Sequence, residues 1–218
     1  GHNLFGSDSL PTIAPLYFRA VVEALGLEVD PFIFERWAKG DYWLRRVDVA
    51  VMVDLGGPIE LAECMNALRV QAHYQHRGRG HIDEGSLRWG GKSSRETVVK
   101  AYDKHKEIMG PKAHRLPDEI PHKTDLEAFA VGKLRLEVEL HARHLEAMNL
   151  RRGSAWHADT AETEWVKAMD KLKISGQMKL TPDQLKSLPK PIRKTYSAWE
   201  SGRDLGACMS RATIYKHR

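Results

Sequence analysis

The sequence predicts an α+β protein in which an antiparallel sheet packs against helices and a small all-helical segment follows. Residues 46–53 and 133–141 place apolar side chains at every second position, which is the period of a strand with one buried face. Stretches with helical spacing of apolar residues accompany them, and beyond residue 151 only short helical stretches follow. A sheet with one polar face and helices on the other is the economical assembly.

The first half of the chain is predicted to hold two amphipathic helices with a strand between them. Two prolines open a helical stretch that Gly26 can end. In the strand 46–53 the valines face the core, and a Gly-Gly-Pro turn separates it from the second helix, residues 59–72. The following stretch, 73–81, is rich in glycine, histidine and arginine and is expected to form a flexible loop.

A hairpin and a second long strand are predicted next. Residues 86–89 and 97–102 have strand character and are joined by a turn rich in glycine and serine. A short helix near residues 126–130 precedes the strand 133–141. In that strand leucine and valine face one way, and the opposite face carries Arg135, Glu137 and Glu139.

The C-terminal part is predicted to be helical. We expect a main domain over residues 1–150, a polar connection over 151–176 and a helical segment over 177–218. The helices of that segment are expected at residues 183–188, 192–200, 205–209 and 212–217. The last two, with a tight turn between them, have the order of a helix-turn-helix. The alternative is an ordinary helical hairpin that closes the core.

Charge and cysteine content limit the class of protein. The net charge is +5, and residues 165–218 hold 12 Lys and Arg against 4 Asp and Glu, so the positive charge is concentrated in the tail. Such a segment attracts polyphosphate, unless it is only a solvated surface.

No apolar run reaches the roughly 18 residues of a membrane span, which predicts a soluble protein. Cys64 and Cys208 lie far apart and form no disulfide or zinc pattern, which favours a reducing compartment.

Two carboxylates on strands form the first candidate site. Asp48 and Glu137 are each flanked by apolar residues that point to the core, so both project from a polar strand face, where they could share a metal ion. The alternative is that Asp48 pairs with Arg46 and Glu137 with Arg135.

The second candidate site lies at the end of the strand 97–102. The hydroxyl of Tyr102 is a poor nucleophile at neutral pH, and a neighbouring cation or metal-bound phosphate would help it attack phosphorus. Lys104 lies on the same face as Tyr102 if the strand continues. The alternative is that Tyr102 is an aromatic side chain packed in a strand.

Several segments together resemble the gene-two replication initiators of filamentous phages and the replication proteins of related phages and plasmids. The resemblance rests on residues 1–6 (GHNLFG), 46–48 (RVD), 89–107 (ending in AYDKHKE) and 134–137 (LRLE), and on the tail at 196–202 and 210–218. These segments occur in the family's order over nearly the whole chain. The resemblance implies a nickase-like fold. It also implies further residues before the first segment and after the last helix, so we expect part of the family domain to be absent here.

The resemblance implies tyrosine chemistry on DNA. Tyr102 would be the nucleophile, Lys104 its electrostatic partner, and Asp48, Glu137 and His2 the ligands of Mg²⁺ or Mn²⁺. The superfamily's His-hydrophobic-His motif does not occur in this chain.

The implied function is initiation of rolling-circle DNA replication. One strand of an origin is nicked, which leaves a 5′-phosphotyrosine and a free 3′-hydroxyl, and the strands are later rejoined. The implied partners are single- and double-stranded origin DNA and the host helicase and polymerase, in the bacterial cytoplasm. DNA contacts are expected from Arg95, Arg211, Thr213, Tyr215 and Lys216. A DNA-binding regulator without catalysis, derived from such an initiator, is the alternative.

Overall fold

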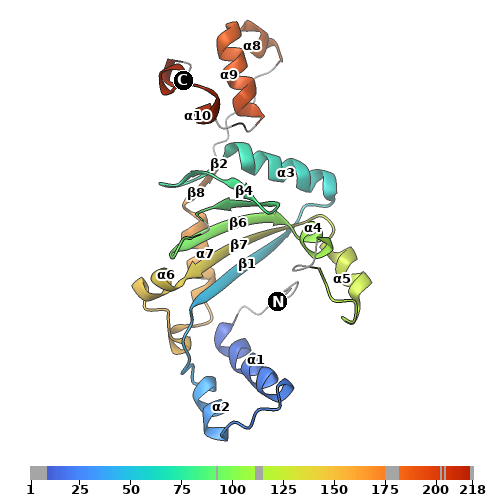
Figure 1. The fold of residues 1–218 in the computed structure, drawn as a ribbon, viewed down its shortest axis with the longest axis vertical. Helices are drawn as coiled ribbons and strands as arrows, with labels where there is room; N and C mark the ends of the chain where they lie inside the picture. The colour runs from blue at the N-terminus through green and yellow to red at the C-terminus, as the bar shows by residue number, and fades with distance from the viewer. Residues whose placement is uncertain are drawn as a thin grey trace.

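The protein is built on a five-stranded antiparallel sheet with helices packed on it (Figure 1). The computed structural model describes residues 9–91, 93–110, 115–174, 182–201, 203 and 205–216. Together with the helical C-terminal part, this architecture confirms the predicted α+β class. No helix within the described residues combines the length and apolar character needed to cross a membrane.

The strands of the main sheet lie in the order β1-β7-β6-β5-β4. Their bounds are β1 Arg46–Asp54, β4 His81–Asp83, β5 Ser86–Trp89, β6 Thr97–Asp103 and β7 Lys133–His141. The two long alternating stretches and the hairpin are therefore strands, as predicted. β7 is flanked by β1 and β6, which places its charged residues in the middle of the polar face.

A second, three-stranded sheet corrects two expectations. β2 (Ala72–Tyr74) pairs with β3 (Gly78–Arg79) and with β8 (Leu172–Ile174). The stretch 73–81, expected to be a flexible loop, thus contributes to both sheets. The stretch 151–176, expected to be a connection, contains β8, the short helix η1 (Gly153–Ala155) and α7 (Thr160–Met169). The buried side chains of Trp156, Ala168 and Leu172 attach it to the main core.

The core lies on the apolar face of the sheet. Val99 of β6 and Val138 and Leu140 of β7 are fully buried there, under Leu61 of α3 (Pro58–Gln71) and Leu145 of α6 (Ala142–Ala147). The valines of β1 follow this pattern only in part. Val47 and Val49 pack against the core, whereas Val51 and Val53 are 39% and 36% exposed. In the described part of the sheet β1 is an edge strand, so its far end lacks the cover that a central strand has.

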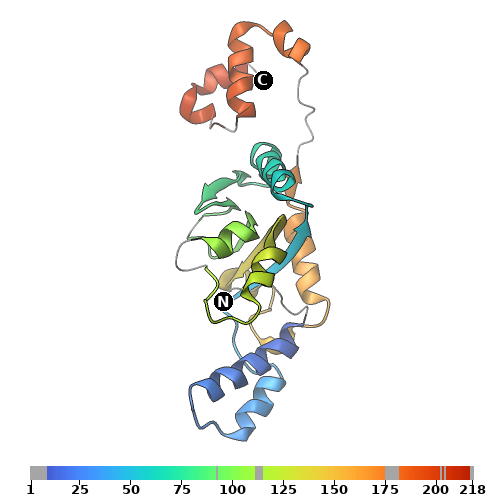
Figure 2. The ribbon, with the colours of Figure 1, turned by 90° about the vertical axis from the view of Figure 1, so that its right-hand side faces the viewer.

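Helical elements extend from both ends of the sheet domain (Figure 2). At one end, α1 (Leu10–Ala24) and α2 (Pro31–Ala38) form a hairpin closed by edge-to-face aromatic contacts among Phe18, Trp37 and Tyr42. At the other end lie α8 (Pro182–Ser187), α9 (Lys190–Glu200), α10 (Leu205–Cys208) and α11 (Arg211–Lys216). Beside the end of β6, α4 (Lys104–Met109) and α5 (Lys123–Ala130) enclose a small second core.

Candidate active site

The polar face of the main sheet brings charged residues of four strands together. The register places Asp48 of β1 opposite Glu139 of β7, and Glu137 opposite Lys100 of β6. Arg88 of β5 lies opposite Lys100 on its other side. Because side chains on adjacent strands point to the same face at paired positions, these groups form one surface.

Glu139 is the centre of this surface. It is 1% exposed, and its carboxylate lies 2.7 Å from Arg46 Nη2, 3.2 Å from Arg88 Nη2 and 3.2 Å from His141 Nε2, with Lys100 as a further partner. Burial raises the pKa of Glu139, but the hydrogen bond and charge of Lys100 and the charges of both arginines outweigh it. The pKa is therefore lowered, and Glu139 is ionised at neutral pH.

Tyr102 and Glu137 form a buried pair on the same face. The Tyr102 hydroxyl donates a hydrogen bond to Glu137 Oε2 at 3.4 Å, and the two residues are 7% and 8% exposed. Burial, followed by the charges of Glu137 and Glu107, raises the pKa of Tyr102. Burial, followed by the charge of Asp48, raises the pKa of Glu137. The hydroxyl is therefore held beside an acceptor in surroundings that disfavour a free phenolate.

Lys104 lies near Tyr102, but it does not continue the strand as expected. The strand ends at Asp103, whose side chain accepts a hydrogen bond from the Lys106 amide at 3.1 Å, and Lys104 begins α4. An N-cap aspartate favours this change from strand to helix. Lys104 is 2% exposed, its ammonium pairs with Glu107, and it lies 5.9 Å from the centre of the Tyr102 ring.

Asp48 and Glu137 share one sheet face, as the alternation predicted, and each also has an arginine partner. Arg46 donates to both Asp48 carboxylate oxygens, at 2.6 and 2.7 Å. Arg135 lies 3.7 Å from Glu137. The described residues contain no group of three or more side chains suited to hold a metal ion. His2, the third expected ligand, lies outside the described residues.

The residues expected to contact DNA lie in two separate places. Arg95 is exposed in the connection between β5 and β6. Arg211, Thr213, Tyr215 and Lys216 belong to α11, where the Thr213 amide donates to Ser210 Oγ at 3.2 Å. Lys216 is exposed, and the side chains of Arg211 and Tyr215 are outside the described part of the structure.

Sequence reasoning missed the role of Glu139 and its cations. The alternation in β7 placed Glu139 on the polar face beside Glu137, and this was the available signal. Its partners Arg88 and Lys100 come from other strands. Only the strand order and register show that they converge.

Comparison with known proteins identifies the family. Residues 1–159 match the model of the Phage CRI family, described as the N-terminal part of the gene-two replication-associated protein. The chain is 35% identical over 219 residues to the gene-two replication-associated protein of Enterobacteria phage I2-2. That alignment covers 100% of this chain and 63% of the relative, so the chain spans less than two thirds of the relative's length. No solved structure matches the chain. This protein belongs to the family of phage gene-two replication-associated proteins.

Proposed function

We propose that this chain initiates rolling-circle DNA replication by nicking one origin strand through tyrosine attack and later rejoining strands. The observation that carries the proposal is the Tyr102 hydroxyl bonded to Glu137 on a sheet face lined with cations. Attack of Tyr102 Oη on phosphorus forms the tyrosine ester and breaks the bond to the 3′ oxygen, which takes a proton from solvent and leaves as a free 3′-hydroxyl. Glu137 Oε2 is the acceptor at hand for the phenolic proton.

The cations of this face suit a phosphodiester substrate. Lys104, whose ammonium lies 5.9 Å from the Tyr102 ring centre and pairs with Glu107, would offset negative charge on the phosphorane-like transition state. Arg88 and Lys100 are held in place by Glu139, so their side chains lose little entropy when an anion approaches. Their role is electrostatic and does not depend on the base sequence of the DNA.

We place a divalent Mg²⁺ or Mn²⁺ ion beside Asp48 and Glu137. Burial, followed by the charge of Asp48, raises the pKa of Glu137, and a bound cation would favour the ionised form of Glu137. Carboxylate oxygens are also ligands that such hard cations prefer. When bound, the ion would neutralise charge on the phosphate. The remaining ligands are to be sought among residues beyond the described ones, of which His2 is the first choice.

The C-terminal helices are proposed to bind duplex origin DNA through α11, with Arg95 as a separate backbone contact. The 3′-hydroxyl released by the nick is a primer end, so host helicase and polymerase are the expected partners. A second candidate is a DNA-binding regulator without catalysis. The burial of Tyr102, at 7% exposure and with a raised pKa, is the observation that favours it.

Covalent capture separates the two candidates. The full chain is incubated with single-stranded oligonucleotides from its own origin and Mn²⁺ or Mg²⁺, labelled on either side of the nick. An initiator retains only the label downstream of the nick, as a 5′-phosphotyrosine adduct, and releases an upstream piece that a polymerase extends. Tyr102→Phe should abolish the adduct and spare DNA binding, whereas Tyr17→Phe, in an exposed tyrosine of α1, should change neither.

Two results would contradict the proposal. Absence of any adduct with the parent chain would leave the regulator as the function. An adduct that persists in Tyr102→Phe would assign the nucleophile to another tyrosine.

A further inference from the structure

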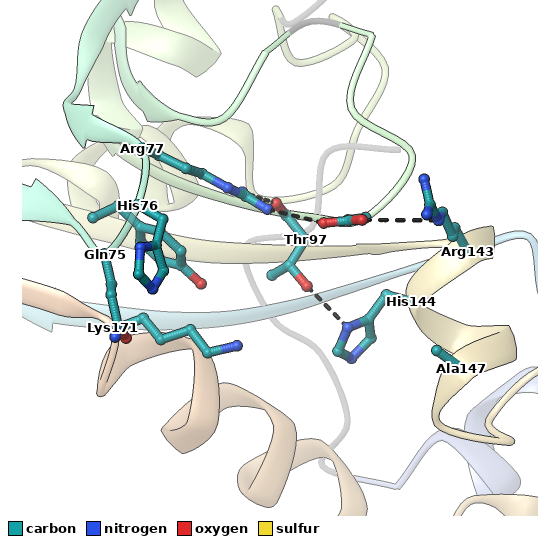
Figure 3. Close-up of a pocket in the computed structure, with 10 residues that line it drawn as sticks. Gln75, His76, Arg77, Thr97, Arg143, His144, Ala147 and Lys171 are labelled. Atoms are coloured by element: carbon teal, nitrogen blue, oxygen red, sulfur yellow. Dashed lines mark hydrogen bonds and ion pairs between the residues drawn. The ribbon is translucent and has the colours of Figure 1, made fainter.

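A pocket of about 590 Å³ lies away from Tyr102, at the opposite end of β6. Four segments far apart in the sequence line it (Figure 3): the β2–β3 turn, the start of β6, the helix α6 and the turn before β8. Its lining residues include Arg77, Glu96, Arg143, His144 and Lys171. Elements of both the small sheet and the main sheet thus line the pocket.

Positive charge exceeds negative charge in this pocket. Within its described lining, Arg77, Arg143 and Lys171 carry three positive charges, and Glu96 carries the one negative charge. No acidic side chain among the described residues forms an ion pair with Lys171, whose side chain extends into the space in Figure 3.

Glu96 holds the two arginines only loosely. Its carboxylate lies 3.6 Å from Arg77 Nη2 and 3.8 Å from Arg143 Nε, beyond normal hydrogen-bond length. The side chains of Glu96 and Arg143 are 52% and 75% exposed. Arg77 Nη1 also donates to the carbonyl oxygen of Thr97, which orients this guanidinium group. The solvated carboxylate that Arg77 shares with Arg143 still leaves donors on both groups for another anion.

The wall of the pocket is rigid behind these solvated cations. His144 Nδ1 lies 3.1 Å from the hydroxyl of Thr97, and His144 Nε2 lies 2.7 Å from the carboxylate of Glu164. Glu164 is 3% exposed and also pairs with Lys167. The imidazole is therefore fixed between β6 and α7.

We propose that this pocket binds a backbone phosphate of the DNA, without reading its sequence, as an anchor separate from the nicking site. The net positive charge, the two arginines that share one solvated carboxylate and the ammonium group of Lys171 select an anion. Tyr74, the one Phe, Tyr or Trp of the described lining, is 3% exposed and covered by Arg77, so its ring cannot stack on a base. That the anion is a DNA phosphate rests on the proposed function.

The anchor does not overlap the chemistry. Thr97 and Tyr102 lie five positions apart on β6, roughly 17 Å along the strand. The odd spacing also points their side chains to opposite faces of the sheet. Exposed Arg95 adjoins the pocket, since its carbonyl accepts a hydrogen bond from the Arg143 amide at 3.1 Å. The proposed anchor and Arg95 thus form one basic surface.

Charge-changing variants of the full chain test the anchor. Binding of a fluorescent oligothymidylate is measured at several salt concentrations. Arg143→Gln and Lys171→Gln should each weaken binding roughly three- to fivefold and lower the log–log salt slope by about 0.7. Glu96→Gln should strengthen binding, because it removes the competing carboxylate. Lys39→Gln, an exposed lysine at the end of α2, serves as the matched control and should change nothing.

Further measurements test the anchor separately from nicking. A methylphosphonate oligothymidylate, whose backbone is uncharged, should bind all variants alike. At saturating origin DNA, Arg143→Gln should form the tyrosine adduct as fast as the parent. If the parent forms the adduct but the pocket variants bind DNA equally, the anchor is refuted and nicking stands. If the pocket variants differ from the parent in DNA affinity and salt slope as expected but no adduct forms, the anchor stands and the proposed nicking fails.

Discussion

At the scale of the residue, Glu139 shows how a carboxylate can organise a cationic surface. It is buried among Arg46, Arg88 and Lys100, and its lowered pKa keeps it ionised. Each cation has a preferred place because the same carboxylate attracts all three. The electrostatic character of the face therefore depends on a residue that is not proposed to touch the DNA.

Glu139→Gln should destabilise the fold in a pH-dependent way. Removing the charge leaves its cations unbalanced, which costs about 2 to 4 kcal/mol, less than for a fully buried pair because Arg46 is 46% exposed. The lowered pKa means that Glu139 stabilises the fold above its unfolded pKa, about 4, and that this stability is lost as pH falls through the folded value.

Urea unfolding at several pH values checks this expectation. The difference in the free energy of unfolding between the parent and Glu139→Gln should be largest near neutral pH and should narrow below about pH 4. Glu146→Gln is the control, because Glu146 is 71% exposed and pairs with Arg151 at 3.6 Å. A gap that stays constant with pH would show that packing, not charge, explains the destabilisation.

Asp48→Ala and Glu137→Ala should weaken the proposed metal site. Outer-shell changes commonly cost tenfold or more in metal affinity, so removal of a ligand should raise the Mn²⁺ needed for half-maximal adduct by at least about tenfold. Calorimetric titration of Mn²⁺ into the DNA-free protein gives a readout independent of cleavage. Asp54→Ala, on the same strand, should behave as the parent. Unchanged titrations would leave both carboxylates as partners of Arg46 and Arg135.

At the scale of the element, strand length decided what could be predicted. β1, β6 and β7 are seven to nine residues long, and their alternation is visible in the sequence. β2, β3 and β8 are two or three residues long, and their pairing joins His73 to Lys173, so no local pattern defines them. The α2 helix was missed although Asp30 caps it by accepting from the Phe32 amide at 2.9 Å.

The candidate site also has one part that the sequence predicts and one part that only the fold shows. Alternation alone placed Asp48 and Glu137 on polar faces, because it depends only on the period of one strand. The convergence on Glu139 depends on which strands are neighbours and in what register. Neither property is written in any single segment.

In α11, Thr213→Ala and Lys216→Ala should affect DNA binding differently. If α10 and α11 act as a helix-turn-helix, the start of α11 reaches base edges and its end meets phosphate. Thr213→Ala should then reduce preference for the origin, and Lys216→Ala should weaken binding to any duplex. Binding to origin and scrambled duplexes measures both effects. Thr213→Ser retains the hydroxyl contact with Ser210, 2.9 Å long, and serves as control. If neither alanine variant changes either affinity, α11 is not a DNA reader.

At the scale of the molecule, the C-terminal helices are separable from the core. The residues of the main core cluster and the side chains packed on it lie between Leu10 and Leu172. The helices meet the sheet domain at its periphery, where Arg69 donates to the Ser201 carbonyl at 3.3 Å and Arg79 stacks on Trp199. Removal of the helices should therefore leave the sheet domain folded.

Deletion of residues 177–218 should flatten the salt dependence of duplex binding and spare cleavage of short single strands. The tail holds much of the chain's positive charge, and the slope falls by about 0.9 for each phosphate that the protein no longer neutralises. Affinity measured across salt concentrations, together with adduct formation on a short origin oligonucleotide, tests both halves. An unchanged slope would show that the charge of the tail is only solvated surface.

The burial of Tyr102 has a kinetic consequence. A hydroxyl that is hydrogen-bonded to Glu137 in a residue only 7% exposed can meet phosphorus only after the surrounding structure opens. The rate of the proposed nicking would then be the rate of the open form multiplied by its population. Each 1.4 kcal/mol or so of opening free energy slows nicking about tenfold. Opening would thus limit the proposed nicking, and single strands that hold the face open would be the strands cut fastest.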